Sequence, residues 1–86
     1  MITDFERKKI KELLPQYVKS VQEVMREKAI FNKQGKVYGK QMIMNVFAGR
    51  SHNPRIEMAI FLAYEKAKKE LNNARERAIN VMTKNN

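Results

Sequence analysis

One short segment of the chain places a cation, two amides and a thioether at the spacing of a single helix face: Lys40, Gln41, Met44 and Asn45. In the major groove of DNA, Gln and Asn can bond bidentately to adenine, Lys can reach guanine, and Met can touch a thymine methyl group. We call these four residues the reading face and predict that they contact bases. An ordinary solvated helix face is the alternative interpretation.

Residues suited to phosphate stand on both sides of this segment: Lys36, Tyr38, Arg50, Ser51 and Arg55. Helix N-termini also attract phosphate through their free amide groups and the helix dipole. Phosphate contacts set the position of a helix in the groove, whereas base contacts set its specificity. We therefore predict that these five residues bind the phosphates on the two walls of the groove.

The distribution of charge indicates the same part of the chain. The formal net charge is +9. Between Glu27 and Glu57 there is no acidic residue, and the basic residues of this stretch are Lys28, Lys33, Lys36, Lys40, Arg50 and Arg55. Lys and Arg release the counterions condensed on a nucleic acid, so a polyanion is expected to bind the middle of the chain first.

Two helices are expected before this basic stretch. Thr3 and Glu6 form a capping-box signature at the start of the first helix, and Pro15 should end that helix near residue 13 or 14. Pro15 then fits the first turn of the second helix. The second helix should fade around Lys28 or Ala29, and its apolar face is Tyr17, Val18, Val21, Val24 and Met25.

Glycines mark the limits of the third helix. Residues 30–38 predict a loop or a very short β-hairpin, because Gly35 permits the positive φ of a tight turn. The third helix should run from residue 40 to residue 47, with Gly39 as its N-cap and Gly49 as a left-handed C-terminal cap. Its inner face should enter the core through Ile43, Val46 and Phe47.

The fourth helix is expected to be the longest. Asn53 and Pro54 predict its start, because Asn caps a helix and Pro fits the first helical position. It should reach about residue 82, a length of roughly 43 Å at 1.5 Å per residue. The expected fold is an all-α, four-helix, helix-turn-helix domain at residues 1–64, with residues 65–86 as a helical extension of the same domain.

The C-terminal part of the fourth helix, beginning at the end of segment 1–64, carries a heptad seam of mostly small apolar residues: Tyr64, Ala67, Leu71, Ala74, Ala78 and Val81. One interpretation is a homodimer whose paired helices set the spacing of two half-sites on DNA. The alternative is that this helix packs back on the first helix, or frays beyond about residue 72.

The stretch 41–50, followed by 53–60, resembles the recognition-helix end of small repressor-like helix-turn-helix regulators of Bacteroidetes and their mobile elements. The family motifs are matched here by Ile43 and Val46, by Gly49-Arg50, and by the segment 53–56. The resemblance covers about residues 15–64 and implies transcription regulation through double-stranded DNA. Residues 29–39 depart from the usual tight turn, and this elongated connection is similar to that in the DNA-binding region of large serine recombinases.

Other chemistry has little support in the sequence. The chain has no cysteine and one histidine, so we expect no metal site. Ser51 beside His52 lacks an orienting acid, so we expect no enzyme, no cofactor and no small-molecule substrate. No apolar run approaches the roughly 20 residues of a membrane span, and no signal peptide is evident, so we expect a cytoplasmic protein.

Two alternative functions are also compatible with the sequence. An RNA-binding or nonspecific nucleoid-type protein could use the same basic segment. A helical protein-interaction adaptor could instead use the long fourth helix as its working surface.

Overall fold

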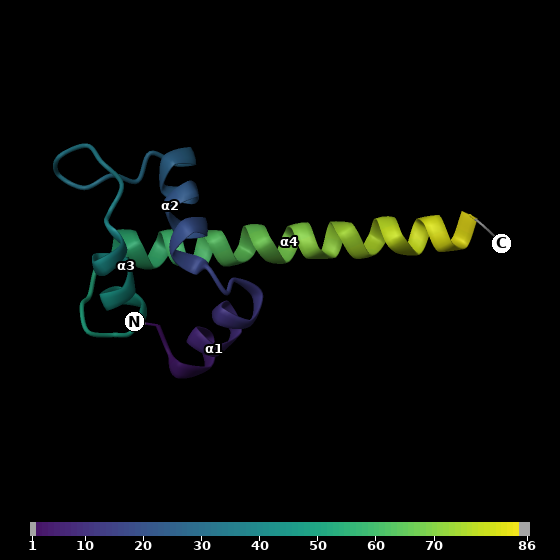
Figure 1. Ribbon diagram of the computed structural model, residues 1–86, viewed down its shortest axis with the longest axis horizontal. Helices are drawn as coiled ribbons and strands as arrows, with labels where there is room; N and C mark the ends of the chain where they lie inside the picture. Colours follow the sequence, from purple (N-terminus) through teal and green to yellow (C-terminus); the bar gives the residue numbers. More distant parts are fainter. Residues whose placement is uncertain (1, 85–86) are drawn as a thin grey trace.

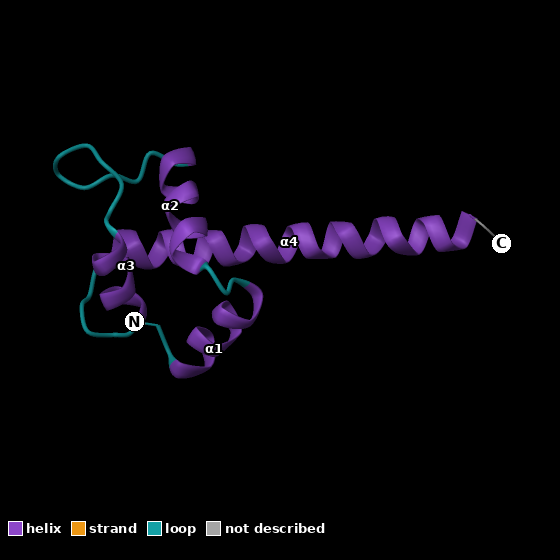
Figure 2. Ribbon diagram, viewed as in Figure 1, coloured by secondary structure: helices purple, strands orange, loops and turns teal. Residues whose placement is uncertain are grey.

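The computed structural model describes residues 2–84. The chain forms four helices: α1 (Asp4–Leu13), α2 (Tyr17–Glu27), α3 (Lys40–Phe47) and α4 (Pro54–Lys84). No strand occurs within residues 2–84 (Figure 2), so the expected all-α class is confirmed. The first three helices gather around one half of α4, and the other half extends away from them (Figure 1).

The predicted capping box starts α1. The Thr3 hydroxyl accepts the Glu6 N–H at 3.1 Å, and the Glu6 carboxylate accepts the Thr3 N–H at 2.9 Å. The helix ends at Leu13, as expected before Pro15. Pro15 does not enter the first turn of α2, so that prediction is wrong. Pro15 lies in the turn between the helices, because Gln16 keeps a non-helical backbone as the N-cap of α2.

Residues 28–39 form a loop, and the β-hairpin alternative does not hold for this stretch. Asn32 organises its tip: the side-chain oxygen accepts the N–H groups of Gln34 at 2.9 Å and Lys36 at 3.1 Å. Gly35 closes the turn at a φ of 76° and donates its N–H to the Asn32 carbonyl. The polar groups of this short segment therefore bond to one another around the turn, and the Asn32 side chain stabilises the loop in place of a pair of strands.

One apolar cluster joins the helices, and its buried members are Ile2, Ile10, Val21, Val24, Met25, Ile30, Ile43, Val46, Phe47, Ile56, Ala59, Ile60 and Ala63. α4 packs against each of the other helices, so it forms the spine of the body. Lys66 Nζ also lies 2.7 Å from Glu27 Oε1 and joins α4 to the end of α2.

The start of α4 is capped as predicted. Asn53 Oδ1 accepts the N–H groups of Arg55 at 3.0 Å and Ile56 at 3.3 Å. From Lys68 to Met82 every side chain is exposed. The free half of the helix gives the molecule its elongated shape of 55 × 28 × 17 Å. Residues 85 and 86, the end of the predicted extension, lie outside the described residues.

Candidate nucleic-acid interface

The two sides of α3 differ sharply in burial. Ile43, Val46 and Phe47 are exposed by 0%, 1% and 3%, so the predicted inner face is confirmed. On the reading face, Lys40 and Gln41 are exposed, and Met44 and Asn45 are half-buried. The structure therefore brings these four side chains to one outward side of one helix. Met42 is also exposed, and its apolar type had given no reason to expect this.

Asn45 connects the reading face to the loop behind it. Its Oδ1 atom accepts hydrogen bonds from Gln41 Nε2 at 3.3 Å and from Arg50 Nε at 3.3 Å. The Asn45 carbonyl also accepts the N–H groups of Arg50 at 2.9 Å and Ser51 at 3.2 Å. Gly49 turns the chain back with a φ of 82°, which brings Arg50 beside the helix it follows.

An aromatic contact holds α2 against α3. Tyr17 stacks on Phe47, with ring centroids 4.2 Å apart and planes inclined by 25°. Burial raises the pKa of the Tyr17 phenol, because the charged phenolate is poorly solvated there, and the nearby positive charge of Arg50 partly opposes this rise. The contact sets the position of the N-terminal turn of α2 relative to α3.

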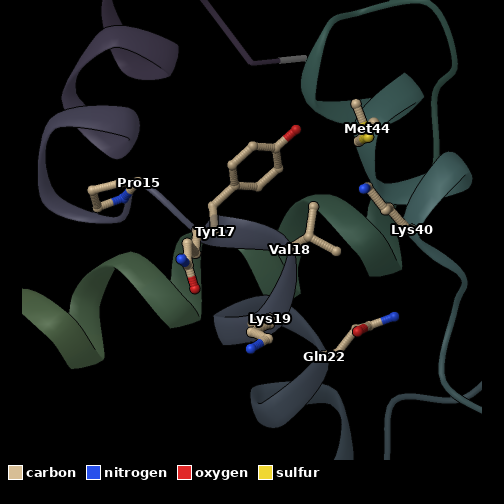
Figure 3. Close-up of a pocket in the computed structure, with 8 residues that line it drawn as sticks. Pro15, Tyr17, Val18, Lys19, Gln22, Lys40 and Met44 are labelled. Carbon is tan, nitrogen blue, oxygen red and sulfur yellow. The ribbon is translucent and has the colours of Figure 1, made fainter.

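A groove of about 540 Å³ separates the start of α2 from the reading face. Its lining residues are Pro15, Gln16, Tyr17, Val18, Lys19, Gln22, Lys40 and Met44. Figure 3 shows Lys40 and Met44 on the α3 side, with Val18 and Gln22 opposite them on α2. A basic and an amide side chain of α2 therefore join the candidate interface.

Lys19 and Gln22 were not among the residues predicted from the sequence to lie at the interface. Their i, i+3 spacing places them on one stripe, but only the packing of α2 on α3 shows that this stripe faces the groove. Gln22 also donates from Nε2 to the Tyr38 carbonyl at 3.1 Å. This bond ties the end of the long loop to α2, just before α3 begins.

The candidate phosphate residues occupy different surroundings. Lys36, Arg50 and Arg55 are exposed, and Tyr38 and Ser51 are half-buried. Arg50 is already bonded to Asn45, so it is part of the reading-face network as well as a surface cation. Ser51 also contacts the reading face, because its backbone N–H donates to the Asn45 carbonyl at 3.2 Å. Lys36, Tyr38 and Arg55 lie in the segments before and after α3.

Arg7 of α1 supports the end of α3. Its Nη1 atom donates to the Ile2 carbonyl at 2.9 Å and to the Phe47 carbonyl at 3.3 Å, and its Nη2 atom pairs with Asp4. Lys11 also stands 5.9 Å above the Phe47 ring. Cations near a helix C-terminus are favourable for its free carbonyls, so α1 stabilises the last turn of α3.

The His52 imidazole lies beside a carboxylate: its Nδ1 atom is 3.5 Å from Glu57 Oε1. Among the described residues, no group of three or more His, Cys, Asp or Glu could hold a metal ion.

The predicted seam of α4 is buried only at its start. Tyr64 and Ala67 are half-buried against the body, and the other members, Leu71, Ala74, Ala78 and Val81, are exposed.

Comparison with known proteins gives no family for this chain: no protein-family model, no curated protein and no solved structure matches it. Within the described residues, no helix combines the length and apolar character needed to cross a membrane. The function of this chain is therefore inferred from the geometry of α2, α3 and the segments beside them.

Proposed function

We propose that this chain is a cytoplasmic transcription regulator that binds double-stranded DNA by inserting α3 into the major groove, with α2 and α3 as its helix-turn-helix unit. The supporting observation is the asymmetry of α3. One side is anchored in the core, and the other presents a cation, two amides and a thioether. A rigid helix with such an outer side matches the donors, acceptors and methyl groups of base edges.

The surroundings of α3 supply the electrostatic part of the proposal. Lys19 and Gln22 of α2 line the same groove as Lys40 of α3. Lys36 and Arg55 are exposed in the segments that precede and follow α3. Basic groups on both sides of a reading helix neutralise phosphates on both groove walls and release counterions. The role is binding without chemistry, as in a repressor or an accessory factor of a mobile element.

We also propose that the exposed half of α4, residues 68–82, pairs with the same helix of a second copy of the chain. An isolated helical segment of this length is marginally stable in water, so a partner helix would stabilise it. Leu71 and Val81 are exposed by 40% and 59%, and along the seam they flank Ala74 and Ala78. Glu70 and Arg77 border the seam with opposite charges, which suits a pair of identical helices.

The test is selection of bound sequences from a random duplex pool, followed by competition with random duplex DNA and structured RNA. We expect an enriched motif that competes better than random DNA by about a thousandfold or more. Equal competition by all duplexes would favour a nonspecific nucleoid-type protein, and preference for structured RNA would favour an RNA-binding protein. Absence of all binding at about 50 mM salt, where phosphate contacts are strong, would contradict a nucleic-acid function.

A helical adaptor is the second candidate, and the exposed apolar side chains of α4 favour it. Ile79 and Met82 are exposed by 61% and 71% and lie at i, i+3 spacing on α4. Apolar groups at helical spacing are the anchors of helix-in-groove recognition. Chains that bind no nucleic acid but associate through α4 would support the adaptor in place of the regulator.

A further inference from the structure

From the hydrogen-bond network of α3 we infer that Asn45 reads its base as a hydrogen-bond donor and prefers guanine, with Arg50 as the positioning residue that imposes this preference. The inference rests on the proposed DNA-binding function and specifies what the reading face recognises. It departs from the simplest expectation, in which Asn pairs with adenine.

The carbonyl side of the Asn45 amide is occupied before any DNA arrives. Its Oδ1 atom accepts from Gln41 Nε2 and from Arg50 Nε, each at 3.3 Å. An amide oxygen has two lone pairs, so both are engaged. The Nδ2 hydrogens are the part of the amide that remains for a ligand.

Adenine and guanine differ in the hydrogen bonds that they can form with an amide whose oxygen is already engaged. Adenine needs an amide that accepts from its N6 group and donates to its N7 atom. Guanine presents two acceptors, N7 and O6, in the major groove. Since the Asn45 oxygen is engaged and its nitrogen is free to donate, guanine gains the contact and adenine loses half of it.

Gln41 keeps the opposite capacity. It uses one Nε2 hydrogen on Asn45 and retains the second hydrogen together with its own Oε1 atom. A carbonyl and one N–H are what adenine requires. The two amides lie one turn apart, so they should prefer different bases at neighbouring positions of the site.

Arg50 is held in place by its backbone as well as by its side chain. Its N–H donates to the Asn45 carbonyl at 2.9 Å, directly after the left-handed turn at Gly49. The guanidinium has five N–H donors, and the bond to Asn45 uses one. The others remain available for phosphate, so one side chain can both orient Asn45 and contribute to affinity.

The experiment compares selected sites for the unmodified chain and for Asn45→Asp, Arg50→Met and Arg55→Met. The position whose preference changes in Asn45→Asp identifies the base that Asn45 contacts; an aspartate accepts only and should select cytosine through its N4 group. At that position we expect the unmodified chain to favour guanine over adenine by roughly tenfold. Arg50→Met should bring the two bases within about twofold, because a lone pair of Oδ1 becomes free to accept adenine N6.

Arg55→Met is the matched control. It removes a neighbouring exposed cation that makes no side-chain bond to Asn45, so it should weaken binding to all sequences and leave the guanine preference intact. An adenine preference in the unmodified chain overturns the inference while leaving the proposed function standing. An unchanged preference in Arg50→Met overturns it as well. Failure to select any sequence overturns both.

A measurement without DNA examines the network itself. In the free protein, the Arg50 Nε–H should exchange with water more slowly than the Arg55 Nε–H, because it is hydrogen-bonded. Asn45→Ala should bring the two exchange rates together, and circular dichroism would verify that the helices remain. Equal exchange rates in the unmodified chain would overturn the inference.

Discussion

Tyr17 at the start of α2 stacks on Phe47 at the end of α3, with ring centroids 4.2 Å apart. The two helices are joined by the long loop 28–39, which does not by itself set the angle between them. The stacked rings, together with the bond from Gln22 to the Tyr38 carbonyl, fix the geometry that a tight turn would otherwise provide.

We expect Tyr17 and Phe47 to be energetically coupled. Phe47→Leu and Tyr17→Leu should each lower the free energy of unfolding, and the double variant should lose less than the sum of the two. The difference should be about 0.5–1.5 kcal/mol, the range for an aromatic pair beyond its buried area. Urea denaturation of the four chains measures it. Strictly additive losses would show that the rings pack without a specific interaction.

The raised pKa of Tyr17 predicts a pH effect at the alkaline end. The pKa of the Tyr17 phenol is 10.0 in the unfolded chain and higher in the folded chain, which therefore holds the phenolic proton more tightly. The contribution of Tyr17 to the free energy of unfolding is therefore fully present below pH 10 and is lost as the pH rises through the pKa of the folded chain. Tyr17→Phe, which cannot ionise, should lose less stability over that window. The tyrosinate absorbance should titrate higher still in Arg50→Met, because the opposing positive charge is gone; a lower value there would contradict the assigned cause.

Gln41→Ala tests base recognition. The variant should cost about 1–3 kcal/mol on the selected site and relax the preference at one base position. Binding to random DNA should change little, since Gln41 carries no charge. Asn73→Ala removes an amide from the free half of α4 and serves as the control. Fluorescence anisotropy on both DNAs gives the comparison, and equal losses on both would argue against base contact by Gln41.

Arg55→Ala tests phosphate contact. It should weaken binding to every sequence and reduce the slope of log affinity against log salt by about one unit. Lys69→Ala removes the same charge from α4, away from α3, and should leave the slope nearly unchanged. Titrations at several salt concentrations measure both slopes. Identical slopes for the two variants would mean that the charge acts only through the net charge of the chain.

Leu71→Asp tests the pairing of α4. A carboxylate at the seam should separate two copies, because it would lie unpaired between apolar side chains. Asn80→Asp adds the same charge on another side of the exposed half of α4 and should leave association intact. Sedimentation velocity over a range of concentrations reports the mass. A monomer at all concentrations for the unmodified chain would exclude the homodimer.

Local signals predicted most of the secondary structure. Thr3 with Glu6, Gly39 with Gly49, and Asn53 with Pro54 each act within a few residues through capping or a required backbone angle, so their effects could be read without the fold. Helical spacing likewise identified the buried side of α3, because hydrophobic burial and the period of a helix are both visible in the chain.

Other features could not be obtained in this way. The choice between loop and hairpin at 30–38 depended on the hydrogen bonds that Asn32 makes around its own turn. The position of Pro15 depended on how the chain turns between two packed helices. In both segments the backbone conformation depends on which of several competing hydrogen-bond partners the chain takes, and amino-acid composition does not resolve that competition.

The sequence by itself determined the helical class, the limits of α3 and which of its sides is buried, because these follow from short-range capping and from periodicity. Only the tertiary structure decided that Tyr17 contacts Phe47, that Lys19 and Gln22 line one groove with Lys40, and that Arg50 bonds to Asn45. These contacts join residues that are distant in the sequence, and they form only when whole helices pack on one core. The local sequence pattern does not encode the angle at which those helices meet.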